Sequence, residues 1–277
     1  MSQTTIESYI EKIVRQVVTS SLQNTNQVNV EKIKPVVVAN WKMNMTLDSI
    51  SKFVHDFSNE NVPVEVVICP PAPYLYVLNA WQVKLNATYS LGAQNVHSEK
   101  SGAYTGDVSA EQLLDVGCQY VIIGHSERRA IGESNEFIHQ KVKQALATGL
   151  IPILCVGETE EERKLGKTNS VVEEQVLSAL QYINDMTKVI IAYEPVWAIG
   201  TGQSAVPEQA QEVHQFIRSV LIKHFGVNAS RLPILYGGSA KPENAKDYSE
   251  MRDIDGLLVG GASLKADDFQ KIIQAFC

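Results

Sequence analysis

Three side chains that could move a proton each follow a short apolar run, at widely separated points of the chain. They are Lys42 after VVVAN, His125 after YVIIG and Glu194 after VIIAY. A carboxylate can remove a carbon-bound proton, an imidazole can polarise a carbonyl, and an ammonium can neutralise the negative charge that develops. Taken singly, each residue is more commonly structural. Their shared position behind an apolar run favours one site for proton transfer next to a carbonyl group.

Two glycine pairs stand behind two further apolar runs. Gly237 and Gly238 precede Ser239, and Gly260 and Gly261 precede Ala262 and a segment with helical spacing. Glycine lets backbone N–H groups approach a phosphate closely, and a helix N-terminus adds a favourable dipole. Each pair could equally form a tight turn alone. Together with the proton-transfer groups, they predict a phosphorylated substrate.

The elements that must position these residues alternate between short β-branched runs and amphipathic stretches, which is typical of βαβ units. Eight such units in about 240 residues predict a closed (β/α)8 TIM barrel, whose catalytic groups lie at the C-terminal ends of the strands. An open doubly wound sheet is less favoured, because no GxGxxG follows the first strand. The predicted strands are Val36–Asn40, Glu65–Cys69, Tyr89–Ala93, Tyr120–Gly124, Ile151–Val156, Val189–Tyr193, Ile234–Tyr236 and Gly256–Val259, and the clearest predicted helices are Ser49–Phe57, Val206–Phe225 and Ser263–Phe276.

Composition excludes several classes of function. The 277 residues carry a net charge of −7, which disfavours binding to nucleic acid or to an anionic membrane. The four cysteines form no CxxC pair, so we expect no metal site and no disulfide framework. We find no apolar run long enough to span a membrane and no secretory leader, and we therefore expect a cytoplasmic protein.

Residues 1–35 differ from the barrel predicted over 36–277. Thr4 and Glu7 have capping-box spacing, and apolar residues then recur on one helical face as far as Val17. A polar stretch without periodicity follows. We predict a short amphipathic N-terminal helix on a flexible linker.

Several strings beyond these single residues make the chain resemble the triosephosphate isomerase family. They are NWKMN, GAQNVHSEKSGAYTGD, VIIGHSERR, CVGETEEER, AYEPVWAIGTG, LYGGSAKPENA and DGLLVGGASL. The resemblance spans roughly Val36 to Phe276. It implies a TIM barrel that interconverts dihydroxyacetone phosphate and D-glyceraldehyde 3-phosphate without a cofactor.

The resemblance also implies roles for individual residues. Glu194 would be the base, a neutral His125 would donate a hydrogen bond to the enediolate, and Lys42 would hold the substrate's charge. Asn40 and Glu127 would orient that lysine. The phosphate would meet the backbone or side chain of Gly200, Ser239, Gly260 and Gly261.

A lid over Pro195 to Ala205 is implied as well. Its first hinge would be Pro195-Val196-Trp197. Tyr236 and Ser239 would latch the closed lid, and Glu158 would contact Trp197 in one lid state. A purely structural role for these partners remains open.

A homodimer is implied by the loop Val96–Thr105, which resembles the arm that family members insert into a partner subunit. Thr105 would then touch the partner's active site. Three departures from the family pattern bear on this region and on the lid. Asp107 replaces a glutamate that would pair with Arg128, residues 129–133 are one residue shorter than usual, and Gln203-Ser204-Ala205 replaces Lys-Thr-Ala.

Two other functions remain possible on sequence alone. One is an isomerase of a four-carbon ketose phosphate, and the other is a non-catalytic barrel. The intact lid motif favours the smaller substrate, and the presence of Lys42, His125 and Glu194 favours catalysis.

The N-terminal segment could pack on its own barrel or on a second subunit, or it could order only on binding. Residues 4–18 also resemble the short peptides that direct cargo into bacterial microcompartments. That resemblance implies a shell or scaffold protein as partner and a location inside the compartment.

Overall fold

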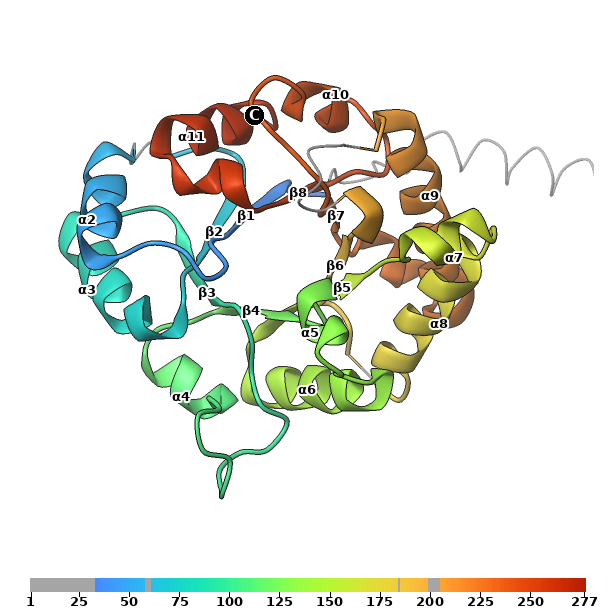
Figure 1. The fold of residues 1–277 in the computed structure, drawn as a ribbon, viewed down its shortest axis with the longest axis horizontal. Helices are drawn as coiled ribbons and strands as arrows, with labels where there is room; N and C mark the ends of the chain where they lie inside the picture. Colours follow the sequence, from blue (N-terminus) through green and yellow to red (C-terminus); the bar gives the residue numbers. More distant parts are fainter. Residues whose placement is uncertain (1–32, 58–60, 184, 199–204) are drawn as a thin grey trace, which may run out of the picture. The chain divides into compact units, whose positions relative to one another are not determined.

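Eight parallel strands form a closed barrel in the computed structural model, which describes residues 33–57, 61–183, 185–198 and 205–277. Strand order follows the chain, so each strand pairs with the next and β8 pairs with β1 (Figure 1). The prediction of a TIM barrel is therefore confirmed. The strands are β1 (Val36–Asn40), β2 (Glu65–Cys69), β3 (Ser90–Ala93), β4 (Tyr120–Ile123), β5 (Ile151–Val156), β6 (Ile190–Tyr193), β7 (Ile234–Tyr236) and β8 (Gly256–Val259).

Helices surround the barrel (Figure 1). The α-helices are α2 (Leu47–Asp56), α3 (Leu75–Leu85), α4 (Ala110–Asp115), α5 (Ser126–Ala130), α6 (Asn135–Thr148), α7 (Glu160–Lys164), α8 (Thr168–Leu180), α9 (Pro207–Phe225), α10 (Ala245–Ser249) and α11 (Ala266–Gln274). Short 3-10 helices are η1 (Ala72–Tyr74), η2 (Val196–Ala198), η3 (Val227–Arg231) and η4 (Gly261–Leu264).

The barrel interior is filled by alternate residues of the strands. Val36 and Val38 belong to a cluster of strand residues only, whereas Val37 and Ala39 pack with residues of the helices. This alternation gives a solid core rather than a pore. Gly92 on β3 faces this interior, because a Cβ there would lie 2.5 Å from Sγ of Cys69. All four cysteines are free thiols in this structure.

The largest difference from the predicted helices lies after β8. A helix was predicted from Ser263 onward, but η4 comes first and α11 begins only at Ala266. The Ser263 hydroxyl bonds to the carbonyls of Val259 and Gly260, at 3.0 and 2.7 Å, and this local pairing favours a tight turn over an α-helix. The turn that follows β8 is therefore a 3-10 helix.

A buried ionic network joins the starts of β7 and β8, at the barrel end opposite the strands' C-termini. The Arg218 guanidinium on α9 donates to Asp253 at 2.9 Å and to Asp255 at 2.6 Å. Asp255 also accepts the backbone N–H of Ile234 at 2.9 Å. Fully paired buried charges of this kind fix the relative positions of neighbouring strands.

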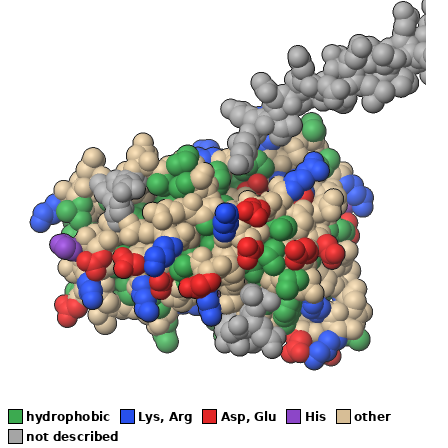
Figure 2. All heavy atoms as spheres, turned by 90° about the horizontal axis from the view of Figure 1, so that it is seen from above, with side chains coloured by type: hydrophobic (Ala, Val, Ile, Leu, Met, Phe, Trp, Pro, Cys, Tyr) green, Lys and Arg blue, Asp and Glu red, His purple; other side chains and the backbone are tan. Residues whose placement is uncertain are grey.

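The face shown in Figure 2 carries positive and negative side chains intermixed, with no large area of one sign. Among the described helices, none is both long and apolar enough to cross a bilayer. The predicted N-terminal helix lies outside the described residues.

Candidate active site

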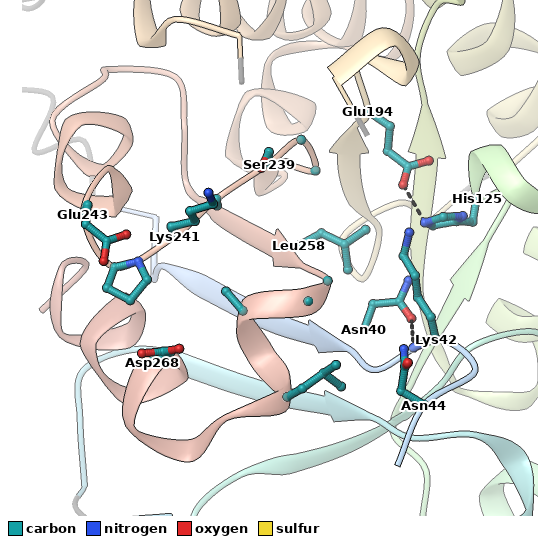
Figure 3. Close-up of a pocket in the computed structure, with 18 residues that line it drawn as sticks. Asn40, Lys42, Asn44, His125, Glu194, Ser239, Lys241, Glu243, Leu258 and Asp268 are labelled. Carbon is teal, nitrogen blue, oxygen red and sulfur yellow. Dashed lines mark hydrogen bonds and ion pairs between the residues drawn. The ribbon is translucent and has the colours of Figure 1, made fainter. Parts of the chain in front are cut away.

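The C-terminal ends of the strands surround a cavity of about 660 Å³, which contains most of the predicted site. Asn40, Lys42, His125 and Glu194 line one part of it, and Figure 3 shows them close together. The two glycine turns and Ser239 line it as well, with Gly237 next to Glu194 and Gly260 next to Lys42. Gly200 lies outside the described residues.

Lys42 has a strained backbone and a paired ammonium group. Its φ is +51°, which is uncommon for a residue with a side chain. Its backbone N–H donates to Oδ1 of Asn40 at 3.0 Å, and its Nζ lies 2.7 Å from Oε1 of Glu127. Partial burial alone would raise the pKa of the Glu127 carboxyl, but the hydrogen bond and charge of Lys42 outweigh it and lower that pKa. The predicted association of these three residues is thus present.

Gln94 is a site residue that the sequence analysis missed. Its Nε2 donates to the carbonyl of Lys42 and to that of Cys69, both at 2.9 Å. Gln94 therefore holds the backbone carbonyl of Lys42, the residue with the positive φ, in place. Gln94 directly follows β3, so the rule that sites gather at strand ends could have indicated it.

His125 joins β4 to α5 and caps that helix. Its Nδ1 accepts the backbone N–H of Glu127 at 3.1 Å, so Nδ1 carries no proton. The ring proton therefore lies on Nε2, which is 2.8 Å from Oε1 of Glu194. This arrangement lets the imidazole donate through Nε2 to Glu194 at the wall of the cavity.

Glu194 follows β6 and is buried. Its other oxygen, Oε2, accepts the backbone N–H of Ser126 at 2.8 Å, so both carboxylate oxygens are engaged by consecutive residues. Two glycines make room for it. A Cβ on Gly237 would lie 2.9 Å from Cγ of Glu194, and a Cβ on Gly157 would overlap the Glu194 carbonyl oxygen.

Glu158 anchors the first predicted hinge of the lid. Its buried carboxylate accepts the indole N–H of Trp197 at 3.0 Å and the hydroxyl of Tyr193 at 3.0 Å. Arg163 pairs with the same carboxylate at 3.2 Å, and its guanidinium lies over the Trp197 ring, 4.4 Å from the ring centre. The predicted contact between Glu158 and Trp197 is present.

Ala205, where the described chain resumes, is held by two tyrosines. The Tyr236 hydroxyl accepts its N–H at 3.1 Å, and the Tyr248 hydroxyl donates to its carbonyl at 2.7 Å. The two rings stack with centres 4.3 Å apart. Tyr236 thus contacts the end of the predicted lid, whereas Ser239 lines the cavity without a described bond to the lid.

The loop predicted as an arm projects from the barrel between β3 and α4 (Figure 1). Thr105 is exposed there. Oδ2 of Asp107 lies 3.9 Å from Nε2 of His97, and Arg128 pairs with Glu133 at 2.7 Å. Within one chain, Asp107 and Arg128 therefore have different partners. The short segment 129–133 still allows α5 to form and His125 to reach the cavity.

Among the described residues, no three His, Cys, Asp or Glu side chains are grouped so that they could hold a metal ion. The groups that line the cavity include an ammonium, an imidazole, a carboxylate and the backbone amides of the glycine turns.

Comparison with known proteins supports the same conclusion as the geometry. Residues 35–276 match the family model of triosephosphate isomerase. The chain is 50% identical to the triosephosphate isomerase of Herminiimonas arsenicoxydans, over 87% of this chain and 99% of that protein. It is 51% identical to that of Carboxydothermus hydrogenoformans, over 87% and 98%, and 47% identical to that of Aquifex aeolicus, over 88% and 100%. The chain belongs to the triosephosphate isomerase family.

Proposed function

We propose that this chain interconverts dihydroxyacetone phosphate and D-glyceraldehyde 3-phosphate through an enediolate, with Lys42, His125 and Glu194 as its catalytic residues. The single observation that carries the proposal is the 2.8 Å contact between Nε2 of His125 and Oε1 of Glu194, in a cavity that Lys42 also lines. The family membership supports the three-carbon substrate, and nothing in the geometry favours the four-carbon alternative or a non-catalytic barrel.

Each catalytic group has one task. The Glu194 carboxylate removes a proton from C1, the electron pair of that C–H bond forms the double bond between C1 and C2, and the π pair of the C2 carbonyl moves onto its oxygen. The N–H of His125 donates to that oxygen, and the Lys42 ammonium stabilises its negative charge. Glu194 then returns the proton to C2 while His125 assists the exchange of the hydroxyl proton between the two oxygens. Substrate and product are isomers and the proton that Glu194 takes up is returned, so no atoms or electrons are gained or lost and the reaction needs no cofactor.

Glu194 has to change its contacts to act as the base. Both of its oxygens are bonded, one to His125 and one to the Ser126 amide. We expect substrate binding to move the carboxylate off these donors and toward C1. His125 would then be free to donate to the substrate oxygen.

The phosphate is assigned to the part of the cavity formed by Ser239 and the glycine turn after β8. Ser239, Gly260 and Gly261 line that part, and their backbone N–H groups can approach an anion because the glycines carry no Cβ. Gly200 would contribute from the lid. Asn40 and Glu127 would hold Lys42 toward the substrate, and Tyr236, Glu158 and Trp197 would fix the two ends of the lid.

Turnover of Glu194→Asp and His125→Gln tests the proposal. Each variant should lower kcat by orders of magnitude, because the carboxylate is withdrawn or the imidazole donor is lost, while the far-ultraviolet circular dichroism stays unchanged. Competitive inhibition by inorganic phosphate should persist in both, since the phosphate is held elsewhere. Near-normal kcat in either variant would overturn the assigned roles, and a higher kcat/KM on a four-carbon ketose phosphate would overturn the substrate.

The protein is also proposed to work as a homodimer. Exposed apolar side chains lie next to the site and along the arm, among them Met43 at 96%, Ile131 at 71% and Tyr104 at 43% exposure. A partner subunit would cover them and bring its Thr105 to the site. Sedimentation should give a dimer, and Thr105→Arg should yield a monomer with reduced kcat. Val83→Glu, which changes an exposed apolar residue on α3, should leave the dimer intact. A fully active monomer would contradict this assignment.

Residues 4–18 are proposed to bind a shell protein of a bacterial microcompartment. The family match begins only at residue 35, so this segment is additional to the family's catalytic unit. Deleting residues 1–30 should leave kcat and KM unchanged and abolish binding to purified shell protein. Lost activity would instead assign the segment to folding or dimer formation, and unchanged binding would refute the docking role. The alternative location is the cytoplasm without a compartment.

A further inference from the structure

The Arg129 side chain connects three elements beneath the catalytic cavity. Its Nε donates to the carbonyl of Gly124 at 2.8 Å, at the end of β4. Its Nη2 donates to the carbonyl of Cys155 on β5 at 3.1 Å, and its Nη1 donates to Oδ1 of Asn135, the first residue of α6, at 2.7 Å. All three contacts use the planar fork of the guanidinium, which only arginine provides.

This cation is bonded to neutral oxygens rather than to acids. Within the described part of the chain, no carboxylate forms an ion pair with Arg129, whereas the buried Arg218 has two such partners. Burial lowers the pKa of the Arg129 guanidinium, and the nearby Cys155, Glu194 and Glu133 oppose that shift. A half-buried charge without an ion-pair partner is costly, so its presence here points to a role other than neutralising an acid.

Two of the three contacts hold the strand ends that support the catalytic pair. Gly124 has a φ of +71° and directly precedes His125, which in turn precedes the Ser126 amide that holds Glu194. On the other strand, Cys155 precedes Val156, whose carbonyl accepts the backbone N–H of Glu194 at 2.7 Å. Arg129 therefore bonds directly beside both supports of the His125–Glu194 pair.

We propose that Arg129 is a positioning residue of the isomerase reaction, which clamps the end of β4 to β5 and thereby sets the separation of His125 and Glu194. The inference rests on the catalytic roles proposed above for these two residues. It concerns the geometry of proton transfer and not the binding of the phosphate. A displacement of either group by about 1 Å can cost a large factor in rate, because the reacting atoms must be aligned.

The test compares Arg129→Lys with Arg218→Lys. Both replace a buried guanidinium by a point charge, but Arg218 lies at the end of the barrel away from the cavity. Arg129→Lys should lower kcat by at least tenfold, with KM and inhibition by inorganic phosphate within twofold of wild type. Arg218→Lys should lower the Tm without changing kcat. The ring N–H resonance of His125 should move in the first variant only.

Asn135→Ala provides a second, milder variant in case Arg129→Lys does not fold. It removes one acceptor of the guanidinium at a partly exposed position and should lower kcat two- to fivefold. A kcat within twofold of wild type in Arg129→Lys, or an equal loss in Arg218→Lys at the same Tm, would overturn the proposal. Normal turnover in His125→Gln or Glu194→Asp would refute the catalytic roles proposed for these two residues. Because those variants leave Arg129 unchanged, that result can be told apart from a failure of the positioning role of Arg129.

Discussion

Trp197 donates its indole N–H to the buried carboxylate of Glu158 at 3.0 Å, and this bond holds the first turn after Glu194. The carboxylate keeps Tyr193 and Arg163 as partners if the indole leaves. Movement of Trp197 would therefore not leave an unpaired buried charge. The hinge can exchange this one bond at a modest free-energy cost.

Trp197→Phe should lower KM and kcat together, by about two- to tenfold. We expect substrate binding to move the indole away from Glu158, so losing the bond favours the bound state and slows product release. Steady-state kinetics and the affinity for inorganic phosphate would measure this. Trp81→Phe, on α3, is the matched control and should change neither constant. A raised KM in Trp197→Phe would mean that the bond persists in the bound state.

Gln94→Leu should reduce activity by removing the two donors that hold the Lys42 and Cys69 carbonyls. The Cys69 carbonyl keeps the Trp41 N–H as a donor, but the Lys42 carbonyl loses the Gln94 bond, and Lys42 can then relax from its positive φ. We expect at least a tenfold loss in kcat/KM, with a raised KM because the ammonium no longer points at the substrate. Gln211→Leu, which removes a buried amide bonded to Asp253, should lower stability and leave kcat/KM intact. Equal kinetic losses in both variants would assign Gln94 to stability alone.

Gly157→Ala should lower kcat by more than a hundredfold, because the added methyl group would overlap the carbonyl of Glu194 and displace the base. Gly149→Ala is the control. It has a φ of +96° at the end of α6, and an added Cβ would meet no atom within 4 Å. That control should cost about 1 kcal/mol of stability from backbone strain and leave kcat unchanged. Turnover of Gly157→Ala within tenfold of wild type would show that the base can readjust.

His214 should make the fold less stable in acid. Burial lowers its pKa to about 3, with a smaller contribution from Arg218, while the unfolded chain has a pKa near 6.5. The unfolded state therefore binds more protons between these values. The free energy of unfolding should fall as the pH drops through this window, by about 1.4 kcal/mol per unit at most.

Urea unfolding at several pH values would measure this slope for His214→Asn, which keeps a donor toward the Asp253 carbonyl. Between pH 4 and 6, the free energy of unfolding of the variant should change less steeply with pH than that of wild type. The difference in slope should correspond to about one fewer proton taken up on unfolding. His55→Asn, at a position where the imidazole is 88% exposed, should leave the slope unchanged. An unaltered slope in His214→Asn would contradict the assignment.

The strands could be predicted because each is a short apolar run that ends near a glycine, proline or asparagine. Since both faces of each strand are buried, its sequence is apolar throughout and lacks the spacing of an amphipathic helix. Every predicted strand is present, with ends that differ by at most one residue. Helix ends were less accurate. Thr46 and Ser49 form a capping box that starts α2 at Leu47, two residues before the predicted start, and a local bond decides such a boundary.

The site was predictable wherever chemistry-bearing residues follow strands directly, as Lys42, His125 and Glu194 do. Gln94 donates to the backbone carbonyls of Lys42 and Cys69, and Arg129 donates to that of Cys155, all of them distant in sequence. No pattern of residue types predicts which carbonyls a side chain will meet. The tautomer of His125 likewise depends on the Glu127 amide and could be assigned only from the fold.

The order of the strands divides the reaction between two halves of the chain. The strands β1 to β4 bring the ammonium and the imidazole, whereas β5 to β8 bring the carboxylate and the glycine turns. Neither half contains a complete set of reacting groups, although each consists of contiguous βα units. If the chain were cut between α6 and β5, turnover could return only when the two fragments close the ring, so isomerase activity would report directly on the reassembly of the barrel.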